Sequence, residues 1–223
     1  MTRLDILNKE IIACRKCARL VEWREEVARV KRRAYVDQEY WGKPVPGFGD
    51  PRARIVVVGL APGAHGSNRT GRNFTGDASG AFLYPALHRA GFANQPTAES
   101  RTDGLELHDL YLTASARCVP PDNKPTREEL NSCQPYVERE LEILRPRVIV
   151  CLGRIAFERV LRIYSVRNPA WKFGHGILLR LENGIWVLCS YHPSQQNTLT
   201  GKLTVKMFDD IWKTARSLID ETS

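Results

Sequence analysis

The sequence predicts an α/β fold, a three-layer αβα sandwich in which helices cover both faces of a parallel sheet. Two observations carry this prediction. The apolar runs rich in Val, Ile and Leu are continuous rather than alternating, which is typical of strands buried on both faces. Segments with helical periodicity separate these runs, and strands that alternate with helices build this architecture. The 223 residues contain no internal repeat and no low-complexity linker, so we expect a single domain over residues 1–223.

Four apolar runs are the predicted strands of the sheet. They are Arg54–Leu60, Leu110–Ala116, Arg147–Gly153 and Ile185–Tyr191. A further short strand is expected at Ile177–Leu181, because the Asn-Gly pair at positions 183 and 184 is a strong turn signal. This hairpin makes the last strand part of a local antiparallel pair.

Helical periodicity predicts four helices between and after these strands. They are Gly80–Ala90, Thr126–Leu144, Ile155–Ile163 and Val205–Ile219. The second helix opens with a capping box, in which Thr126 is the N-cap and Glu129 follows three residues later. Asp77, just before the first helix, is a candidate N-cap.

The charge balance is basic, with a formal net charge of +8. Arg29, Lys31, Arg32 and Arg33 lie within five positions, either as a solvated helix face or loop or as contacts to the phosphates of a polyanion. No apolar run approaches the ~20 residues that a membrane span requires. The N-terminus has no apolar signal core, so we expect neither a membrane protein nor a secreted one.

The six cysteines divide into two groups. Cys151 and Cys189 lie within predicted strands, where a buried thiol packs as a small hydrophobic group. The others lie in loops or at helix edges and are placed to reach one point: Cys14, Cys17, Cys118 and Cys133. Four thiolates suit either a structural zinc ion or an iron–sulfur cluster, and four unrelated thiols are the remaining alternative. Either metal centre would link the N-terminal segment to the loop after the second strand through shared ligands.

A segment almost without large side chains follows the first predicted strand. It reads GLAPGAHG over residues 59–66. Its glycine spacing is not the dinucleotide fingerprint and it lacks the lysine of a P-loop, which excludes these two phosphate-binding motifs. Ligands of parallel α/β sheets bind outside the carboxyl ends of the strands. We therefore expect backbone N–H groups of this loop to bind a carbonyl oxygen of a flat ligand.

Other unusual residues follow the same and neighbouring strand ends, and we expect them to converge on one cleft. Phe74 is either a core residue or a stacking platform. His192, which precedes a proline, is either a satisfied strand-end histidine or a donor that stabilises charge on a leaving group.

Three features together resemble the uracil-DNA glycosylase superfamily, and within it family 5, the B-type enzymes of bacteria and archaea. They are GLAPGAHG with the following NFTGD, the late HPS at residues 192–194, and the four spaced cysteines. The likeness runs from Cys14 to about Lys206. It implies a central four-stranded parallel sheet and a 4Fe–4S cluster near the N-terminus on Cys14, Cys17, Cys118 and Cys133. It also implies cleavage of the N-glycosidic bond of a deaminated base flipped out of double-stranded DNA.

The resemblance assigns roles to individual positions. Phe74 is similar to the platform on which the flipped uracil stacks, and the backbone of Gly59–Gly63 is similar to the loop that hydrogen-bonds a uracil carbonyl. His192 resembles the donor to uracil O2. The segment of Ser194, Gln195, Gln196 and Asn197 resembles the loop that enters the minor groove beside the lesion.

Three positions depart from the best-known members of the superfamily. Ala61 stands where an acid or Asn positions the attacking water. Gly63 stands where a Tyr excludes the thymine methyl group, and Ala114 where an Asn reads the uracil edge. These differences agree with the family 5 pattern, whose members accept a broader set of bases, including hypoxanthine.

We expect a dissociative cleavage in which negative charge builds on the base and positive charge on the sugar. His192 and loop N–H groups would stabilise the base anion. Asp77, the carboxylate nearest the first motif, would stabilise the oxocarbenium ion or orient the water. Asn123 is the candidate to replace the missing Asn, and His65 is a further polar candidate. No lysine motif suggests Schiff-base chemistry, so we expect a monofunctional enzyme that leaves an abasic site.

The expected protein is a monomer of the prokaryotic cytoplasm, associated with the nucleoid and not with a membrane. The sequence leaves two alternatives open. One is a non-catalytic iron–sulfur module that binds damaged DNA, and the other is a zinc-stabilised nucleotide-binding α/β protein.

Overall fold

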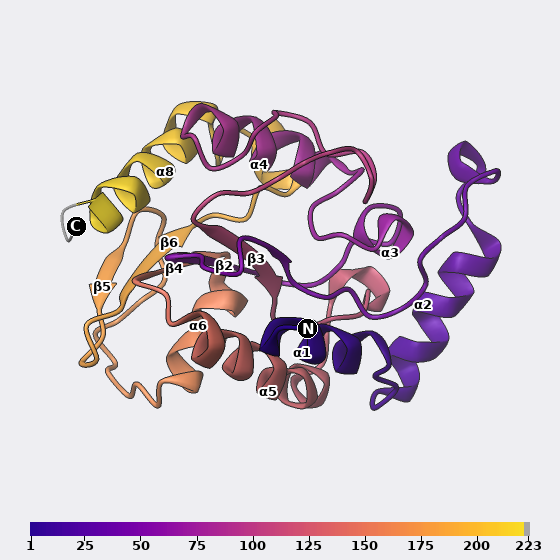
Figure 1. Cartoon of the computed structure of the whole chain (residues 1–223), viewed down its shortest axis with the longest axis horizontal. Helices are drawn as coiled ribbons and strands as arrows, with labels where there is room; N and C mark the ends of the chain where they lie inside the picture. Colours follow the sequence, from indigo (N-terminus) through magenta and orange to yellow (C-terminus); the bar gives the residue numbers. More distant parts are fainter. Residues whose placement is uncertain (221–223) are drawn as a thin grey trace.

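A six-stranded sheet lies between two layers of helices in the computed structural model, which describes residues 1–220 (Figure 1). The strand order is β1-β3-β2-β4-β6-β5. The strands are β1 Phe48–Gly49, β2 Ile55–Gly59, β3 Leu110–Ala114, β4 Val148–Leu152, β5 Leu178–Arg180 and β6 Trp186–Ser190. All five strands expected from the sequence are present, each within about two residues of its predicted ends.

The sheet is mixed, which corrects the expectation of a four-stranded parallel sheet. Strands β3, β2, β4 and β6 form a parallel centre, and the edge strands β1 and β5 run antiparallel to β3 and β6. The turn at Asn183-Gly184 produces the β5–β6 hairpin, as the sequence predicted. Strand β1 has only two residues, which is too short for any periodic signal.

The helices are α1 Arg3–Ile12, α2 Ala18–Val30, α3 Ser67–Thr70, α4 Ala78–Arg89, α5 Arg127–Leu144, α6 Arg154–Ile163, α7 Gln195–Leu199 and α8 Val205–Asp220. Helices α4 and α8 cover one face of the sheet, and α1, α5 and α6 cover the other (Figure 1). Helices α2 and α3 lie together at one end of the molecule. Two short 3₁₀ turns occur at Arg33–Tyr35 and Pro121–Asn123.

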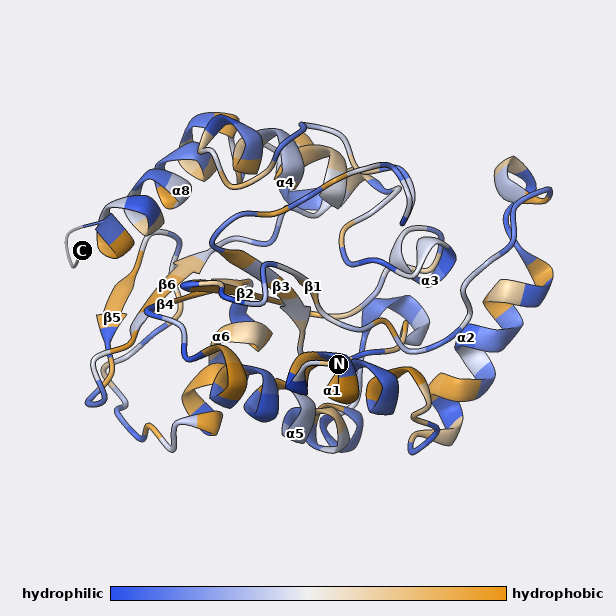
Figure 2. Ribbon diagram, in the orientation of Figure 1, coloured by the Kyte–Doolittle hydropathy of each residue, from blue (hydrophilic) through white to orange (hydrophobic). Residues whose placement is uncertain are grey.

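Burial on both faces explains why the apolar runs are continuous. Along β2, Ile55 and Val57 pack with α4 and α8, whereas Val56 and Val58 pack with α5 and α6. Figure 2 shows the same pattern, with apolar strands at the centre and polar residues on the outer sides of the helices. None of the helices in the part of the chain that the structure describes is both long and apolar enough to span a bilayer.

The helix signals at α4, α5, α6 and α8 are confirmed. The capping box at α5 is present, because the Glu129 N–H donates to Thr126 Oγ1 at 3.2 Å and the Thr126 N–H donates to Glu129 Oε2 at 2.7 Å. Helices α1 and α2 were not predicted. Helix α1 also starts with a capping box, formed by Thr2 and Asp5, so a signal for it was present in the sequence.

Candidate functional site

A cavity of about 830 Å³ opens at the carboxyl end of the parallel strands, as expected for a sheet of this type. Its walls come from the loop after β2, the segment before α4, the end of β3 with its following turn, and the loop after β6. Residues singled out in the sequence line it, among them Ala61, Gly63, His65, Phe74, Asp77, Asn123, His192, Ser194 and Gln195. The structure therefore brings most of the expected site together in one place.

Two expected residues lie behind the cavity rather than on its wall. Gly59 is the last residue of β2 and packs under the ring of Phe74. Asn197 lies in the first turn of α7 and its side-chain amide donates to the backbone carbonyl of His192 at 2.9 Å. Both residues shape the site without facing the ligand space.

The bare loop after β2 makes room for two large site side chains. A Cβ on Gly66 would lie 2.0 Å from Asp77 Oδ2, and a Cβ on Gly63 would lie 3.1 Å from the same atom. A Cβ on Gly59 would lie 2.9 Å from Cζ of Phe74. The small residues of this loop thus let the carboxylate and the aromatic ring approach its backbone closely.

Phe74 is both a core residue and a wall of the cavity. Its side chain is 8% exposed and packs with the core on the α4 and α8 side of the sheet. Its ring lies beside that of His192, with centroids 5.9 Å apart and planes inclined by 34°. Its φ of 53° is rare for a residue with a bulky side chain, and such strain persists only where the surroundings enforce it.

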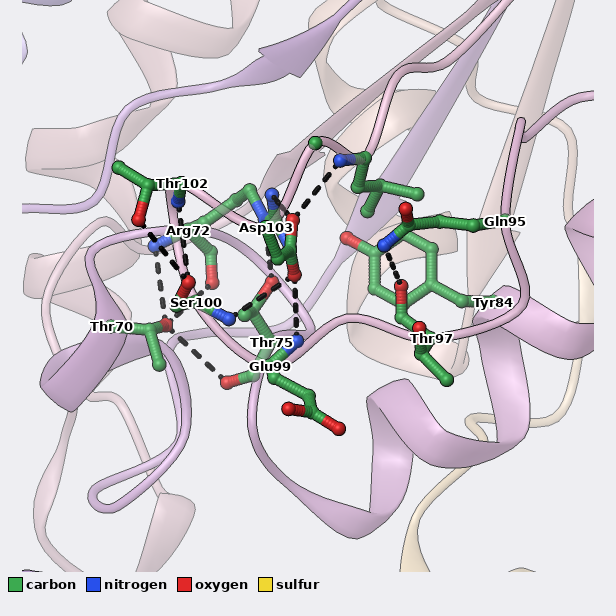
Figure 3. A network of polar contacts seen from close by, with 12 residues as sticks. Thr70, Arg72, Thr75, Tyr84, Gln95, Thr97, Glu99, Ser100, Thr102 and Asp103 are labelled. Atoms are coloured by element: carbon green, nitrogen blue, oxygen red, sulfur yellow. Dashed lines mark hydrogen bonds and ion pairs between the residues drawn. The ribbon is translucent and has the colours of Figure 1, made fainter.

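A buried polar network enforces the conformation of the Phe74 segment (Figure 3). Arg72 donates through both terminal nitrogens to Asp103, at 2.8 and 2.7 Å, and through Nε to Thr75 Oγ1 at 2.9 Å. Tyr84 Oη, from α4, donates to the carbonyl of Asn73 at 2.8 Å. The residues on each side of Phe74 are therefore fixed, and the ring is fixed with them.

Asp77 is the N-cap of α4, as predicted, and it also lines the cavity. Its Oδ1 accepts from the Gly80 N–H at 3.0 Å. Burial raises the pKa of Asp77, whereas the N–H groups of Gly80 and Ser79 and the charge of Arg69 act in the opposite direction. One other carboxylate lines the cavity, that of Asp122, which is exposed at the rim and belongs to none of the sequence motifs.

His192 presents a neutral imidazole to the cavity. Burial lowers its pKa to about 4, so the ring is uncharged at neutral pH and carries one N–H donor. The turn that follows is ordered by Ser194, which caps α7. A neutral histidine next to an aromatic platform can donate a hydrogen bond to a ligand without adding a buried charge.

His65 belongs to a side of the cavity that the sequence did not reveal. Its Nδ1 is 3.0 Å from the hydroxyl of Tyr40, and Arg32 and Tyr35 line the cavity nearby. Burial lowers the pKa of His65, with smaller effects from the charges of Arg32 and Arg69. No local pattern in the sequence places residues 32–40 beside the glycine-rich loop, because this contact is purely tertiary.

Asn123 lies at the mouth of the cavity, in the turn after β3. Both Asn123 (φ 57°) and the preceding Asp122 (φ 53°) are in the left-handed region, which these two residue types tolerate better than others. Ala114, at the end of β3, also lines the cavity. The wall is thus open where other members of the resembled superfamily carry an Asn.

The four cysteines of the second group line one small pocket, away from the large cavity. Cys118 and Cys133 are buried, and Cys14 and Cys17 are partly exposed. Arg24, on α2, is 2% exposed and donates through Nη1 to Cys118 Sγ at 3.0 Å. Within residues 1–220, no group of three or more His, Cys, Asp or Glu side chains is arranged to hold a metal ion. Cys151 and Cys189 are buried in β4 and β6, as predicted.

Comparisons with known proteins agree with the resemblance seen in the sequence. Residues 46–216 match the family model described as "Uracil DNA glycosylase superfamily". The chain is similar to the type-5 uracil-DNA glycosylase of Mycobacterium leprae, with 52% identity over 217 residues that cover 95% of this chain and 94% of that protein. It is 54% identical to the type-5 enzyme of Thermus thermophilus over 209 residues, 93% of this chain and 94% of the relative. The type-5 enzyme of Pyrobaculum aerophilum is 44% identical over 211 residues, 95% and 91% of the two chains.

Proposed function

Since the chain belongs to the uracil-DNA glycosylase superfamily and to its family 5, we propose that it hydrolyses the N-glycosidic bond of uracil in double-stranded DNA. It is a monofunctional glycosylase, and its product is an abasic site. The observation that carries the proposal is the convergence of Phe74, Asp77 and His192 on one cavity at the carboxyl edge of the sheet. That cavity supplies an aromatic surface, a carboxylate and a neutral donor.

The base would be held between the Phe74 ring and the backbone of the glycine-rich loop. Stacking on an aromatic side chain suits any base that has been flipped out of the duplex. His192 then donates to the base oxygen on which negative charge develops as the bond breaks. One such donor typically contributes about 3 kcal/mol to the stability of the transition state. A neutral imidazole can serve this role because its N–H donates a hydrogen bond to the developing anion while the ring keeps its proton.

Asp77 is the carboxylate that we assign to the sugar side of the reaction. Ala61 offers no acid in the first motif, and Asp122 is exposed at the rim, whereas Asp77 is held between the loop after β2 and the start of α4. A carboxylate in that place stabilises an oxocarbenium ion or orients the attacking water. Asn123 is the nearby amide that we propose for contact with the base or the water.

The pocket is also proposed to accept hypoxanthine and other deaminated bases. Ala61, Gly63 and Ala114 all line the cavity, and none has a side chain large enough to exclude a bigger base. A purine occupies more space than uracil, and an open wall offers less steric discrimination. Duplexes that carry uracil, hypoxanthine, xanthine or thymine opposite a defined base test this substrate range directly.

The four-cysteine pocket is proposed to hold a 4Fe–4S cluster through Cys14, Cys17, Cys118 and Cys133. Zinc is the alternative, although these thiols are not arranged around a single ion in the described chain. The donor set consists of four thiols that line one pocket, which suits such a cluster. Arg24 fits an anionic group there, because its buried Nε has no hydrogen-bond partner in the described chain and its Nη1 already donates to Cys118. The group would act as a structural clamp between the α1–α2 turn, the end of β3 and α5.

Double-stranded DNA is the proposed partner, and we propose that the protein acts as a monomer on the nucleoid in a prokaryotic cytoplasm. Lys31, Arg32 and Arg33 follow the end of α2, and Arg32 reaches the cavity wall. Cations beside a base pocket are positioned to contact the phosphates that flank a flipped nucleotide.

Alkaline treatment of a single-uracil duplex after incubation with the protein tests the proposed activity. We expect strand scission at the uracil position and none in the matched thymine duplex. Binding of the uracil duplex without scission would reject the glycosylase and would leave the non-catalytic damaged-DNA module. A preparation that is brown and absorbs near 400 nm supports the cluster, and a colourless preparation with bound zinc rejects it.

A further inference from the structure

Arg69, on the short helix α3, joins three separate segments around the large cavity. Its Nε donates to the carbonyl of His65 at 2.7 Å, and its Nη2 donates to the carbonyl of Gly76 at 2.9 Å. Its Nη1 donates to Oε1 of Gln38 at 2.6 Å. One guanidinium therefore holds the glycine-rich loop, the segment that leads into Asp77, and the chain after α2.

The chain after α2 is a basic lobe, which we define as residues 31–38. In Figure 1 it projects from the end of α2 at the right of the molecule and then turns back toward α3. Arg69 meets the lobe twice, because its guanidinium also lies over the ring of Tyr35 at 4.1 Å from the centroid. The backbone adds a further link nearby, since the Trp41 N–H donates to the carbonyl of Arg69 at 2.9 Å.

The local backbone is shaped around this guanidinium. Gly76 has a φ of 73°, and a Cβ at this position would lie 2.3 Å from Nη2 of Arg69. No carboxylate forms an ion pair with Arg69 within residues 1–220. Three of its five N–H donors bind uncharged oxygens, so no carboxylate of the described chain neutralises its charge.

We propose that Arg69 is a positioning residue that fixes the basic lobe to the cavity wall that carries Asp77. The lobe, which would contact the DNA phosphates, is then held at a constant distance from the carboxylate at the base pocket. The inference deepens the proposed function and rests on the role assigned there to Asp77. Catalytic groups that are misplaced by about 1 Å lose about 10²-fold in rate. A residue that sets the distance between the phosphate-binding lobe and the Asp77 carboxylate therefore affects both DNA binding and the rate of cleavage.

The charge of Arg69 also acts on Asp77. Burial raises the pKa of this carboxyl, whereas the N–H groups of Gly80 and Ser79 and the charge of the Arg69 guanidinium lower it. Asp77 in turn adds to the effect of burial in raising the pKa of the Tyr84 phenol. Arg69 is the cation among them, and it favours the ionised carboxylate against the effect of burial. Without Arg69, the pKa of Asp77 rises further and a larger fraction of the enzyme is protonated at mildly acidic pH.

Single-turnover cleavage of a uracil duplex, with protein in excess and at several concentrations, separates the two effects. Arg69→Met is expected to lower the limiting rate about 30-fold and to raise the half-saturating protein concentration about fivefold. It should also shift the acidic limb of the rate–pH profile to higher pH. Gln38→Ala removes the hydrogen bond from Arg69 to the lobe and keeps those to His65 and Gly76, so it should raise the half-saturating concentration about threefold and leave the limiting rate within twofold. Arg69→Lys keeps the charge without the three-way contact and should retain the wild-type acidic limb.

Arg89→Met is the matched control, because Arg89 pairs with Asp209 on α8 away from the cavity. Its rate, half-saturation and pH profile should equal those of the wild type. Melting temperatures of all variants identify any that fail to fold, in which case Gln38→Ala and Arg69→Lys carry the test.

The inference is overturned if Arg69→Met leaves the acidic limb in place, or if Gln38→Ala does not change half-saturation. Asp77→Asn, measured in parallel, separates this failure from that of the proposed function. If Asp77→Asn is inactive while Arg69→Met cleaves at the wild-type rate, the Arg69 inference alone is wrong. If Asp77→Asn retains the wild-type rate, the carboxylate role and its coupling to Arg69 are both wrong.

Discussion

Asp77 and the loop after β2 show how single residues shape this site. Gly66 and Gly63 leave the space that the carboxylate occupies, and the α4 N-terminus supplies the donor that holds it. The carboxylate is thus preorganised by a cap and by missing side chains. Its position depends on residues that take no part in the chemistry themselves.

Gly66→Ala tests this dependence. The added Cβ would lie 2.0 Å from Asp77 Oδ2, so the carboxylate or the loop must move. We expect the limiting single-turnover rate on a uracil duplex to fall about 10²-fold, with an unchanged far-UV circular dichroism spectrum. Gly63→Ala, whose Cβ would lie 3.1 Å from the same atom, should lose much less. Equal and wild-type rates for both variants would contradict this account of the loop.

His192 makes stability depend on pH. Its pKa is about 4 in the folded protein and about 6.5 in an unfolded chain, so protons bind preferentially to the unfolded state between these values. The stabilisation is complete above about pH 6.5 and is lost as the pH falls toward 4. Between pH 7 and pH 5 the wild type should therefore lose about 2 kcal/mol more than His192→Asn, measured by urea unfolding at each pH. Identical losses in the two proteins would reject a depressed pKa.

At the scale of elements, the segment from Thr70 to Thr75 depends on the loop before β3. Arg72 is 4% exposed and its charge is balanced by Asp103, which also accepts from the N–H groups of Glu99, Ser100 and Leu105 (Figure 3). These contacts hold the pKa of Asp103 below its usual range, with burial opposing them. Phe74, the proposed base platform, is thus anchored to a loop about thirty residues further along the chain.

Asp103→Ala should damage both stability and catalysis. It leaves the buried Arg72 guanidinium without its partner, and breaking such a pair by removing one member costs about 3–5 kcal/mol. Phe74 then loses part of the frame that enforces its positive φ, so the limiting rate should fall as well. Chemical denaturation and single-turnover assays measure the two effects, and Asp209→Ala, at the exposed pair with Arg89, serves as the control. A loss no larger than that of the control would show that the network does not support the platform.

The sequence predicted the elements whose signals are local. Continuous apolar runs identified the strands, Thr126 and Glu129 marked the start of α5, and Asn183-Gly184 marked the hairpin. Strand β1 escaped notice because two residues carry no period. The number of parallel central strands was predicted correctly. The antiparallel edge strands make the sheet mixed, and the sequence signals such a pairing only for the β5–β6 hairpin.

The site residues also divide into those with a local sequence signal and those that only tertiary contacts reveal. Phe74, Asp77 and His192 were identified through motifs and their place at strand ends, and they line one cavity. Tyr40 and Arg69 were missed, because their importance comes from contacts with His65, Gly76 and Gln38 that only the folded chain creates. Asp77 was expected as a candidate N-cap and as a candidate catalytic carboxylate, and the structure shows an N-cap that also lines the cavity.

At the scale of the whole molecule, the four-cysteine pocket connects parts of the chain that are far apart in sequence. Cys14 and Cys17 flank the turn between α1 and α2, whereas Cys118 follows β3 and Cys133 lies on α5. A metal centre there would brace the N-terminal helices, and with them the basic lobe, against the sheet. The brace would influence DNA binding without taking part in the chemistry.

If the pocket holds the proposed cluster, Cys17→Ser will remove the absorbance near 400 nm and lower the melting temperature, because one of the four proposed thiolate ligands is lost. Cys189→Ala changes a buried cysteine outside the pocket and should keep the absorbance of the wild type. Iron and sulfide analysis of both variants completes the measurement. An absorbance that survives in Cys17→Ser would exclude this residue as a ligand.

Asp77 and His192 line one cavity, and we propose that together they perform the cleavage of the base. The most direct test is the single-turnover rate on a single-uracil duplex for the wild type, Asp77→Asn and His192→Ala, each checked for folding by its melting temperature. We expect the wild type to cleave and each variant to lose about 10²-fold or more, in keeping with the loss of one preorganised charge-stabilising group. Cleavage by Asp77→Asn near the wild-type rate, with His192→Ala inactive, would contradict the carboxylate role, and wild-type rates for both would place the active site elsewhere.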